Sequence, residues 1–285
     1  MHDGPGIRTT VFLKGCQLRC AWCHNPETLR AAPELRVDTA VCIACGACAD
    51  ACPHGARVSG FDRARCQGCG ACAAVCYAGG LALVGREMTA DAVVAEVLRD
   101  RAFFARSGGG VTVSGGEPLY QRAFTRAILA GCTAAGLHCA VETNLAWPWA
   151  QAATLLPVTD LVMMDVKLID DAAHRRWTGV SNARVLANLP RVAAAKPLIV
   201  RTPVIVGVNA DDAAIAAIAD MLATLPALEY YELLPYHPLG AGKYETLGYT
   251  RDASLASPTP DELRRLARLA RTRGIPVRVL GELLP

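Results

Sequence analysis

The chain lacks long apolar runs, abundant aromatic residues and a strong net charge. No apolar run reaches the roughly 18 residues of a transmembrane helix, and residues 1–16 show no secretory signal. Aromatic residues make up 6% and the formal net charge is +3 without a basic block, so we expect no nucleic-acid partner and no membrane association. With 52% hydrophobic and 19% charged residues, the chain is not disordered. We expect a globular cytoplasmic protein.

Cysteine, by contrast, is abundant and unevenly placed. Eleven of the 13 cysteines fall between residues 16 and 76, and we expect the other two, Cys132 and Cys139, to be ordinary buried thiols. A disulfide framework is typical of small secreted domains, whereas a chain of 285 residues in a reducing compartment does not need one. Clustered thiols in such a protein more often bind metal. The sequence therefore predicts metal centres near its N-terminal end.

Residues 42–84 are rich in Cys, Gly and Ala and contain an internal repeat. CIACGACADACPHGA (42–56) aligns with CQGCGACAAVCYAGG (66–80) at a period of 24, with eight of fifteen positions identical. We expect two metal loops related by pseudo-symmetry. Because the flanking segments read as one continuing fold, we predict a domain of residues 1–41 and 85–285 into which residues 42–84 are inserted.

Short apolar runs alternate with helical periodicity along the rest of the chain. A helix is predicted from Thr89 to Arg106, and another begins at Thr259, where Pro260 and Glu262 complete the start signal. Repeated strand–helix units indicate a parallel α/β fold. Six units and an end strand are too few for a closed eight-fold barrel, so we predict an open partial (β/α)6 TIM-type barrel with active-site groups at the carboxyl ends of the strands. The expected strands are 9–13, 111–113, 138–141, 161–166, 198–206, 229–234 and 277–280.

Cys16, Cys20 and Cys23 form a C-x3-C-x2-C motif directly after the first expected strand. Three thiolates on one loop can hold three irons of a [4Fe–4S] cube and leave the fourth iron without a protein ligand. An open coordination position is typical of a catalytic metal. The alternative is a zinc ion completed by His24 or a distant cysteine, although the spacing differs from the usual paired C-x2-C motifs.

The repeat carries the C-x2-C-x2-C-x3-C run of bacterial ferredoxins, with Pro53 after the first run and Tyr77 after the second. In those proteins the fourth cysteine of each run binds the other cluster, so the resemblance implies a small α+β ferredoxin-like insert with two fully ligated [4Fe–4S] clusters that relay electrons. A zinc ribbon made from two Cys-x2-Cys pairs is the alternative, but it leaves four cysteines unexplained. The implied ligand sets are Cys42, Cys45, Cys48 and Cys76 for one cluster and Cys52, Cys66, Cys69 and Cys72 for the other.

C-x3-C-x2-C is also the signature of radical S-adenosylmethionine (SAM) enzymes. The stretch HDGPGIRTTVFLKGCQLRCAWCHNPET (2–28) resembles the glycyl-radical-enzyme activating enzymes, the group of the pyruvate formate-lyase activase, and SGGEP (114–118) and LPYH (234–237) fit the same family. The resemblance implies that SAM binds the open iron and that one electron splits it into methionine and a 5′-deoxyadenosyl radical. That radical would take hydrogen from a backbone glycine of a partner glycyl radical enzyme.

The same resemblance implies anaerobic operation, with flavodoxin or ferredoxin as electron donor. Relatives usually carry another strand's worth of residues before HDGPGIR, so we expect a weakened sheet edge here. Two other functions remain open: a radical SAM enzyme acting on a small molecule, and a pure electron-transfer protein. A pure carrier has no use for the open iron that the C-x3-C-x2-C motif implies.

The resemblance also assigns residues at the strand ends. Glu117 matches the acceptor of the SAM amino group and Glu142 the ribose-contacting acid, and Asp165 with Lys167 lies along the ribose and carboxylate. A structural ion pair between neighbouring strands is the alternative for Asp165 and Lys167. Arg201 matches a residue at the junction of SAM and the glycine loop. The implied catalytic residues are Cys16, Cys20, Cys23, Lys167 and Arg201, and the cofactor-binding residues are Trp22, Cys23, His24, Gly115, Gly116, Glu117, Glu142, Asp165, Val166, Lys167 and His237.

Two further assignments concern the surroundings of SAM. His237 resembles the adenine-side histidine of the family, and Trp22 and His24 could touch the adenine or could simply pack against the cysteine loop. A monovalent cation is implied near a group of four residues. Those four are Glu142, Thr143, Met163 and Asp165.

Overall fold

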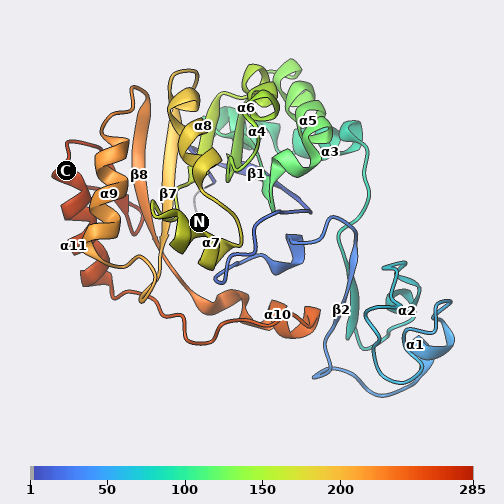
Figure 1. Cartoon of the computed structure of the whole chain (residues 1–285). Coiled ribbons are helices and arrows are strands. Elements are labelled where there is room, and N and C mark those ends of the chain that lie inside the picture. The colour runs from blue at the N-terminus through green and yellow to red at the C-terminus, as the bar shows by residue number, and fades with distance from the viewer. Residues whose placement is uncertain (1–2, 285) are drawn as a thin grey trace.

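An open, mostly parallel sheet forms the centre of the larger part of the protein (Figure 1). The structure, a computed structural model, describes residues 3–284, so the first residue of the HDGPGIR motif, His2, lies outside the described residues. Neighbouring strands are parallel except for β9 and β10, and β1 and β10 form the two edges. The predicted α/β partial barrel is confirmed. In sheet order the strands are β1 (Arg8–Leu13), β4 (Gly110–Gly115), β5 (His138–Thr143), β6 (Leu161–Asp165), β7 (Leu198–Val204), β8 (Leu228–Pro235), β9 (Val277–Val279) and β10 (Glu282–Leu283).

Helices connect the strands and cover the outer face of the sheet (Figure 1). Four of them begin at a residue whose side chain accepts a backbone N–H, and the predicted capping box of Thr259 and Glu262 is confirmed. No helix within residues 3–284 is both long enough and apolar enough to cross a membrane. The helices of this part are α3 (Ala90–Leu98), α4 (Arg101–Ser107), α5 (Arg122–Ala134), α6 (Trp149–Ala152), α7 (Asp171–Thr178), α8 (Ala183–Ala193), α9 (Asp212–Leu222), α10 (Ala241–Leu247) and α11 (Pro260–Arg271), with 3-10 turns η1 (Pro26–Thr28), η2 (Pro118–Gln121), η3 (Ala153–Val158) and η4 (Pro238–Gly240).

Some element bounds differ from the prediction. The helix expected over residues 89–106 is divided into α3 and α4, because Asp100 leaves the helical path and its carboxylate accepts a hydrogen bond from Thr9 on β1 at 2.6 Å. The strand expected to end at Val206 ends at Val204. The short strand β10 was not predicted, since a two-residue strand has no detectable periodicity.

The two faces of the sheet carry different residues. On β7, Val200 packs into the main apolar core under the helices, whereas Ile199 and Arg201 face the opposite, inner side. A small apolar cluster that includes Ile199 and Met163 fills part of the inner face. Charged side chains therefore occupy the concave side of the sheet, where a ligand rather than a helix can cover them.

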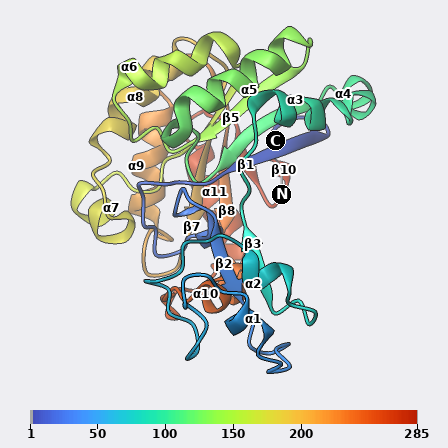
Figure 2. The ribbon, with the colours of Figure 1, turned by 90° about the vertical axis from the view of Figure 1, so that its right-hand side faces the viewer.

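The cysteine-rich segment forms a separate small unit (Figure 2). Its two-stranded antiparallel sheet pairs β2 (Glu34–Val37) with β3 (Leu81–Val84), and its two short helices are α1 (Ala47–Asp50) and α2 (Ala71–Ala74). Gly46 and Gly70 precede these helices in the same left-handed conformation, at φ +80° and +79°. The repeat of the sequence is thus a repeat of the backbone. The domain bounds at residues 42 and 84 stay a prediction, and β2 shows that the small sheet draws one strand from before residue 42.

Polar contacts attach this small unit to the barrel beside α10. The Arg63 guanidinium donates to the carbonyls of Thr246 (3.1 Å) and Leu35 (3.4 Å). The carboxylate of Glu34 accepts a hydrogen bond from Tyr249 at 2.6 Å and pairs with Lys14 at 3.3 Å. Lys14 follows β1 directly, so the small unit is anchored next to the loop that carries the first cysteines.

Candidate active site

The three cysteines of the C-x3-C-x2-C motif lie on the loop after β1. Cys16 is 8% exposed, and Cys20 and Cys23 are partly buried. The loop is tied to the barrel by backbone hydrogen bonds, such as Gly15 N to Thr28 O at 2.7 Å and Arg19 N to Thr178 O at 2.7 Å. The thiols are therefore held at the carboxyl edge of the sheet, where a parallel α/β fold places its active site.

Burial strongly affects the acidity of these thiols. It raises the pKa of Cys16 and Cys20 to about 12 and that of Cys23 to about 11. Metal binding must therefore release three protons from the thiols, and iron favours this step because its positive charge stabilises the resulting thiolates. No three His, Cys, Asp or Glu side chains of the described residues are gathered closely enough to hold one metal ion. Three cysteine thiols on one loop are the donors that iron–sulfur clusters use, and each would bind a different iron, so the chemistry of this donor set fits a four-iron cluster.

Gly115 and Gly116 allow the end of β4 to pack directly against the start of the cysteine loop. A Cβ atom on Gly115 would lie 2.2 Å from the Leu13 carbonyl oxygen, and one on Gly116 would lie 2.5 Å from that of Gly15. Both distances are shorter than any real contact. The close approach therefore requires glycine at both positions, independently of any ligand.

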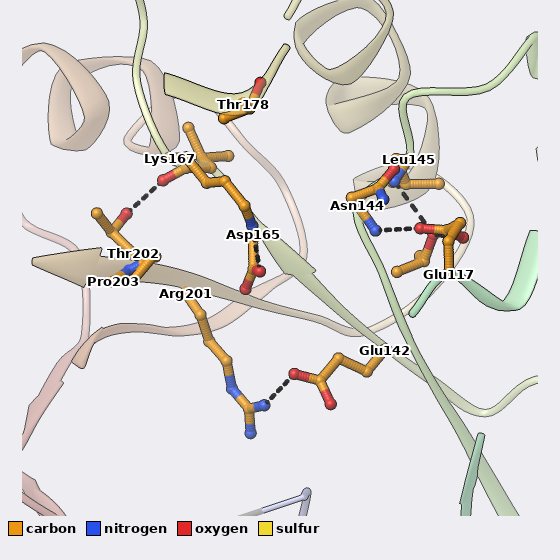
Figure 3. A network of polar contacts seen from close by, with 12 residues as sticks. Glu117, Glu142, Asn144, Leu145, Asp165, Lys167, Thr178, Arg201, Thr202 and Pro203 are labelled. Atoms are coloured by element: carbon orange, nitrogen blue, oxygen red, sulfur yellow. Dashed lines mark hydrogen bonds and ion pairs between the residues drawn. The ribbon is translucent and has the colours of Figure 1, made fainter. Parts of the chain in front are cut away.

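Glu117, which follows these glycines, is fully buried. Its carboxylate accepts hydrogen bonds from Leu119 N (2.9 Å) and Thr143 Oγ1 (2.6 Å). It also accepts one from Asn144 N at 2.7 Å (Figure 3). Burial raises its pKa to about 7 despite these donors. The side chain therefore joins the ends of β4 and β5, and its contact with a SAM amino group stays a prediction.

A chain of ionic contacts crosses the inner face of the sheet. Arg201 on β7 donates to Glu142 on β5 at 3.0 Å (Figure 3) and to Glu232 on β8 at 3.1 Å. Glu142 also accepts a hydrogen bond from Ser114 at 2.7 Å, and Arg278 lies 3.6 Å from Glu232. Burial raises the pKa of Glu142 although Arg201 opposes this shift. The buried charges are thus paired with one another, as burial requires.

Lys167 and Asp165 form an ion pair near the cysteine loop (Figure 3). Lys167 is 7% exposed. Burial lowers its pKa, but the carboxylate of Asp165 and the sulfurs of Cys20 and Cys16 outweigh that effect and raise it. The ion pair joins residues of one strand end rather than of neighbouring strands, and it keeps the Lys167 ammonium protonated beside the thiols. Val166 between them is fully buried, and its backbone N–H and carbonyl bond to β7.

The predicted adenine-side residues lie together. The rings of His24 and His237 contact edge to face at a centroid distance of 4.4 Å, and both line a small pocket with Trp22, Cys23 and Tyr236. His24 Nε2 and His237 Nδ1 are buried and have no hydrogen-bond partner within residues 3–284. Unpartnered buried nitrogens cost free energy unless a ligand satisfies them. The free volume of the pocket is only about 10 Å³, so contact of His24 and His237 with the adenine stays a prediction.

The four residues predicted around a monovalent cation lie on neighbouring strands, with Glu142 opposite Met163. Their polar atoms already have protein partners. The Glu142 carboxylate bonds to Arg201 and Ser114, Asp165 pairs with Lys167, and the Thr143 hydroxyl donates to Glu117. A cation would have to replace these contacts, so the cation site stays a prediction.

In the small unit, the repeat brings together one of the two predicted ligand sets around a shared pocket. That pocket is also lined by Leu35, Phe61 and Arg57. Cys52 Sγ accepts a hydrogen bond from Ala56 N at 3.2 Å. Of the other set, Cys42 and Cys45 are exposed, and Cys48 and Cys76 pack against the small core. The cysteines around the pocket are Cys52, Cys66, Cys69 and Cys72.

Sequence reasoning missed two residues of this region. Glu232 holds Arg201 from the far side, and Asn144 points its amide at Cys16. The signal for Glu232 was present, since it is a charge within the apolar run predicted as strand 229–234. Asn144 gave no signal in the sequence, because a single asparagine after a strand is common in turns.

Comparison with known protein families agrees with this geometry. The profile of the Radical SAM superfamily matches residues 63–219, which is more than half of the chain, and the profile of the 4Fe-4S binding domain matches residues 35–58. The isethionate sulfite-lyase activating enzyme of Nitratidesulfovibrio vulgaris is 44% identical over 281 residues, covering 93% of this chain and 90% of that protein. The benzylsuccinate synthase activating enzyme of Thauera aromatica is 40% identical over 297 residues, covering 99% and 90%.

A solved structure is similar as well. The crystal structure of a domain of the pyruvate-formate lyase-activating enzyme from Bacteroides vulgatus superposes with a TM-score of 0.53 at 32% identity. The match covers 61% of this chain and 100% of that domain.

Proposed function

This chain belongs to the glycyl-radical-enzyme activating enzymes of the radical SAM superfamily, and on that premise we propose that it removes a hydrogen atom from a backbone glycine of a partner glycyl radical enzyme. The observation that carries the proposal is the position of Cys16, Cys20 and Cys23. They lie on one loop at the carboxyl edge of the barrel, beside a pocket with unpartnered ring nitrogens.

Cys16, Cys20 and Cys23 would hold three irons of a [4Fe–4S] cluster and leave the fourth open to SAM. When bound, this cluster supplies the electron that splits SAM into methionine and a 5′-deoxyadenosyl radical. The protein's part is to place the reacting carbon and keep water away from it. His24 and His237 offer ring nitrogens to the adenine, and the buried cation of Lys167 offers a partner to the methionine carboxylate.

Arg201 would orient the site through the carboxylates at its two ends. Glu142 can bond to a ribose hydroxyl while it stays paired with Arg201, because a carboxylate accepts several hydrogen bonds. Gly115 and Gly116 let the end of β4 pack against the cysteine loop and so bring Glu117 next to it. A sheet that keeps these groups rigid limits the motion of a radical, which favours transfer to the glycine over side reactions.

The small unit would hold two further [4Fe–4S] clusters, which makes three in the holoenzyme. The pocket formed by Cys52, Cys66, Cys69 and Cys72 supports one of them. Both would be fully ligated, which suits electron relay from a flavodoxin or ferredoxin donor to the radical site. We place this chemistry in the cytoplasm, where eleven clustered thiols stay reduced.

The deciding experiment reduces reconstituted protein anaerobically with SAM and a candidate partner. An isethionate sulfite-lyase is the first to test, because the activating enzyme of such a lyase is 44% identical to this chain. An EPR glycyl-radical signal is expected, and it should disappear when the radical-bearing glycine of the partner is replaced by alanine. Release of 5′-deoxyadenosine with no radical in any partner would favour a small-molecule substrate. Absence of SAM turnover would contradict the proposal.

A further inference from the structure

One buried amide that the sequence did not assign to the site points at a cysteine of the barrel loop. Asn144 follows β5 and is 8% exposed. Its Nδ2 atom lies 3.8 Å from Cys16 Sγ, a hydrogen bond to sulfur within the buried part of the site. Sulfur is a weak acceptor as a thiol and a stronger one as a charged thiolate, so this contact strengthens when Cys16 binds iron.

The orientation of the Asn144 amide is determined by its neighbours. The backbone N–H of Ala146 can only donate, and it lies 3.0 Å from Asn144 Oδ1. Gln17 Nε2 donates to the same oxygen at 2.9 Å. Because the oxygen is occupied by two donors, the NH2 group must be the end that faces Cys16.

The backbone around Asn144 is held unusually firmly. Its N–H donates to Glu117 at 2.7 Å (Figure 3), and the next residue, Leu145, has φ +51°, a conformation that leucine rarely adopts. Asn188 Nδ2 bonds to the carbonyls of Leu145 (3.0 Å) and Trp147 (2.8 Å) and so stabilises this turn. Such strain persists only where the surroundings over-determine it, and it is common at functional sites.

We propose that Asn144 is a positioning residue that donates a hydrogen bond to the Cys16 thiolate and thereby raises the reduction potential of the cluster that SAM binds. This inference rests on the proposed function. Hydrogen bonds to ligating sulfurs set the potentials of iron–sulfur clusters, because a donor stabilises the more negative, reduced state. Asn144 therefore makes the cluster easier to reduce than the thiolates alone would.

The test compares Asn144→Leu, which removes the donor at similar size, with Thr133→Val in the reconstituted holoenzyme. Thr133 is a matched control, because its hydroxyl donates to Cys139 Sγ at 3.5 Å and Cys139 is no predicted ligand. The measurement is an EPR-monitored redox titration of the cluster whose signal changes when SAM is added. We expect a more negative midpoint potential in Asn144→Leu and an unchanged one in Thr133→Val.

A second variant, Asn144→Asp, is titrated in parallel in case the leucine disturbs folding. It keeps the size and the contact with Ala146, and it replaces the NH2 group with a carboxylate oxygen, so the midpoint potential should also fall. A midpoint equal to that of wild type in a variant with an intact cluster overturns the inference alone. A wild-type protein with no SAM-responsive cluster overturns the proposed function as well, so the two failures are distinguishable.

Discussion

The two groups of clustered cysteines in this chain are held in opposite ways. The barrel loop buries Cys16 to 8% exposure and is tied to the sheet and to neighbouring helices. The small unit buries Cys72 to 6% exposure but leaves Cys42, Cys45 and Cys69 exposed, and its two helices have only four residues each. One group is part of a rigid core, and the other depends on whatever it binds for most of its stability.

The acidity of the thiols shows the same contrast. Burial raises the pKa of Cys16 to about 12. Burial also acts to raise the pKa of Cys52, but backbone N–H groups of residues 54–57 point at its sulfur and lower it overall. A nest of N–H donors favours the anion before any metal arrives. At Cys52 the small unit thus favours the thiolate electrostatically, whereas burial raises the pKa of Cys72 in the same unit, as it does for the cysteines of the barrel loop.

The largest expected effect comes from removing one thiol in each region. Cys16→Ala should reduce SAM cleavage to background, because the cluster with the open iron loses one of three ligands. Cys42→Ala should retain measurable cleavage when a strong artificial reductant replaces the relay. The measurement is 5′-deoxyadenosine formed under anaerobic conditions, and equal losses in both variants would contradict the relay function of the insert.

Breaking a buried ion pair should lower the free energy of unfolding more than breaking an exposed one. Glu232→Ala removes one partner of Arg201, whose side chain is 5% exposed and which stays paired with Glu142, and we expect a loss of about 1.5–3 kcal/mol in the free energy of unfolding. Arg65→Ala in the insert breaks the exposed pair with Asp62 and should change it by less than about 0.5 kcal/mol. Chemical denaturation of both variants measures the difference, and similar losses would contradict the contrast.

Glu117 should make the stability of the barrel depend on pH. Its pKa of about 7 lies above the ordinary 4.5, so the folded state keeps a proton that the unfolded state loses. The stabilising contribution of the protonated Glu117 is fully present below pH 4.5. As the pH rises to about 7, the free energy of unfolding should fall by about 3 kcal/mol.

The pH dependence can be measured by thermal denaturation of Glu117→Gln, Glu262→Gln and wild type between about pH 3 and pH 7.5. Glu117→Gln should lack this fall in stability. Glu262 is a control of opposite sign, because the hydrogen bonds of the capping box lower its pKa. Wild type therefore loses the contribution of Glu262 as the pH falls below about 4.5. Glu262→Gln lacks this contribution at every pH and should not show that loss. A Glu117→Gln curve parallel to that of wild type would rule out this role of Glu117.

The smallest effects concern the two halves of the insert. Ala44 (φ +55°) and Gly68 (φ +65°) occupy equivalent positions of the repeat. Ala44→Gly relieves the left-handed strain and should stabilise the insert by up to about 1 kcal/mol. Gly68→Ala should destabilise it, because the new Cβ would lie 2.4 Å from the Pro33 carbonyl oxygen. The temperature at which the iron–sulfur absorbance disappears measures both changes, and effects of equal sign would contradict this explanation.

Local patterns in the sequence were enough to predict the parallel fold and the strand ends that carry polar residues. Cys16, Asp165 and Arg201 stood out because each is chemically unusual at its place along the chain. The pairing of Arg201 with Glu142 and Glu232 could not be predicted, because it depends on the register of three strands and on side-chain direction. Strand β2 was missed for a similar reason, since its partner β3 lies more than 40 residues away.

Helix α10 contacts both cysteine-bearing regions at once. On one side Tyr244 donates to the Cys23 carbonyl at 2.8 Å and Lys243 pairs with Glu27 at 2.6 Å, and on the other the Thr246 carbonyl accepts from Arg63. Deleting the insert would therefore remove one of the two sets of contacts that hold α10, and the neighbouring cysteine loop would become less rigid. Engineers who shorten this protein need to rebuild that surface of α10, and a chimera with a foreign ferredoxin module must reproduce the arginine that reaches it.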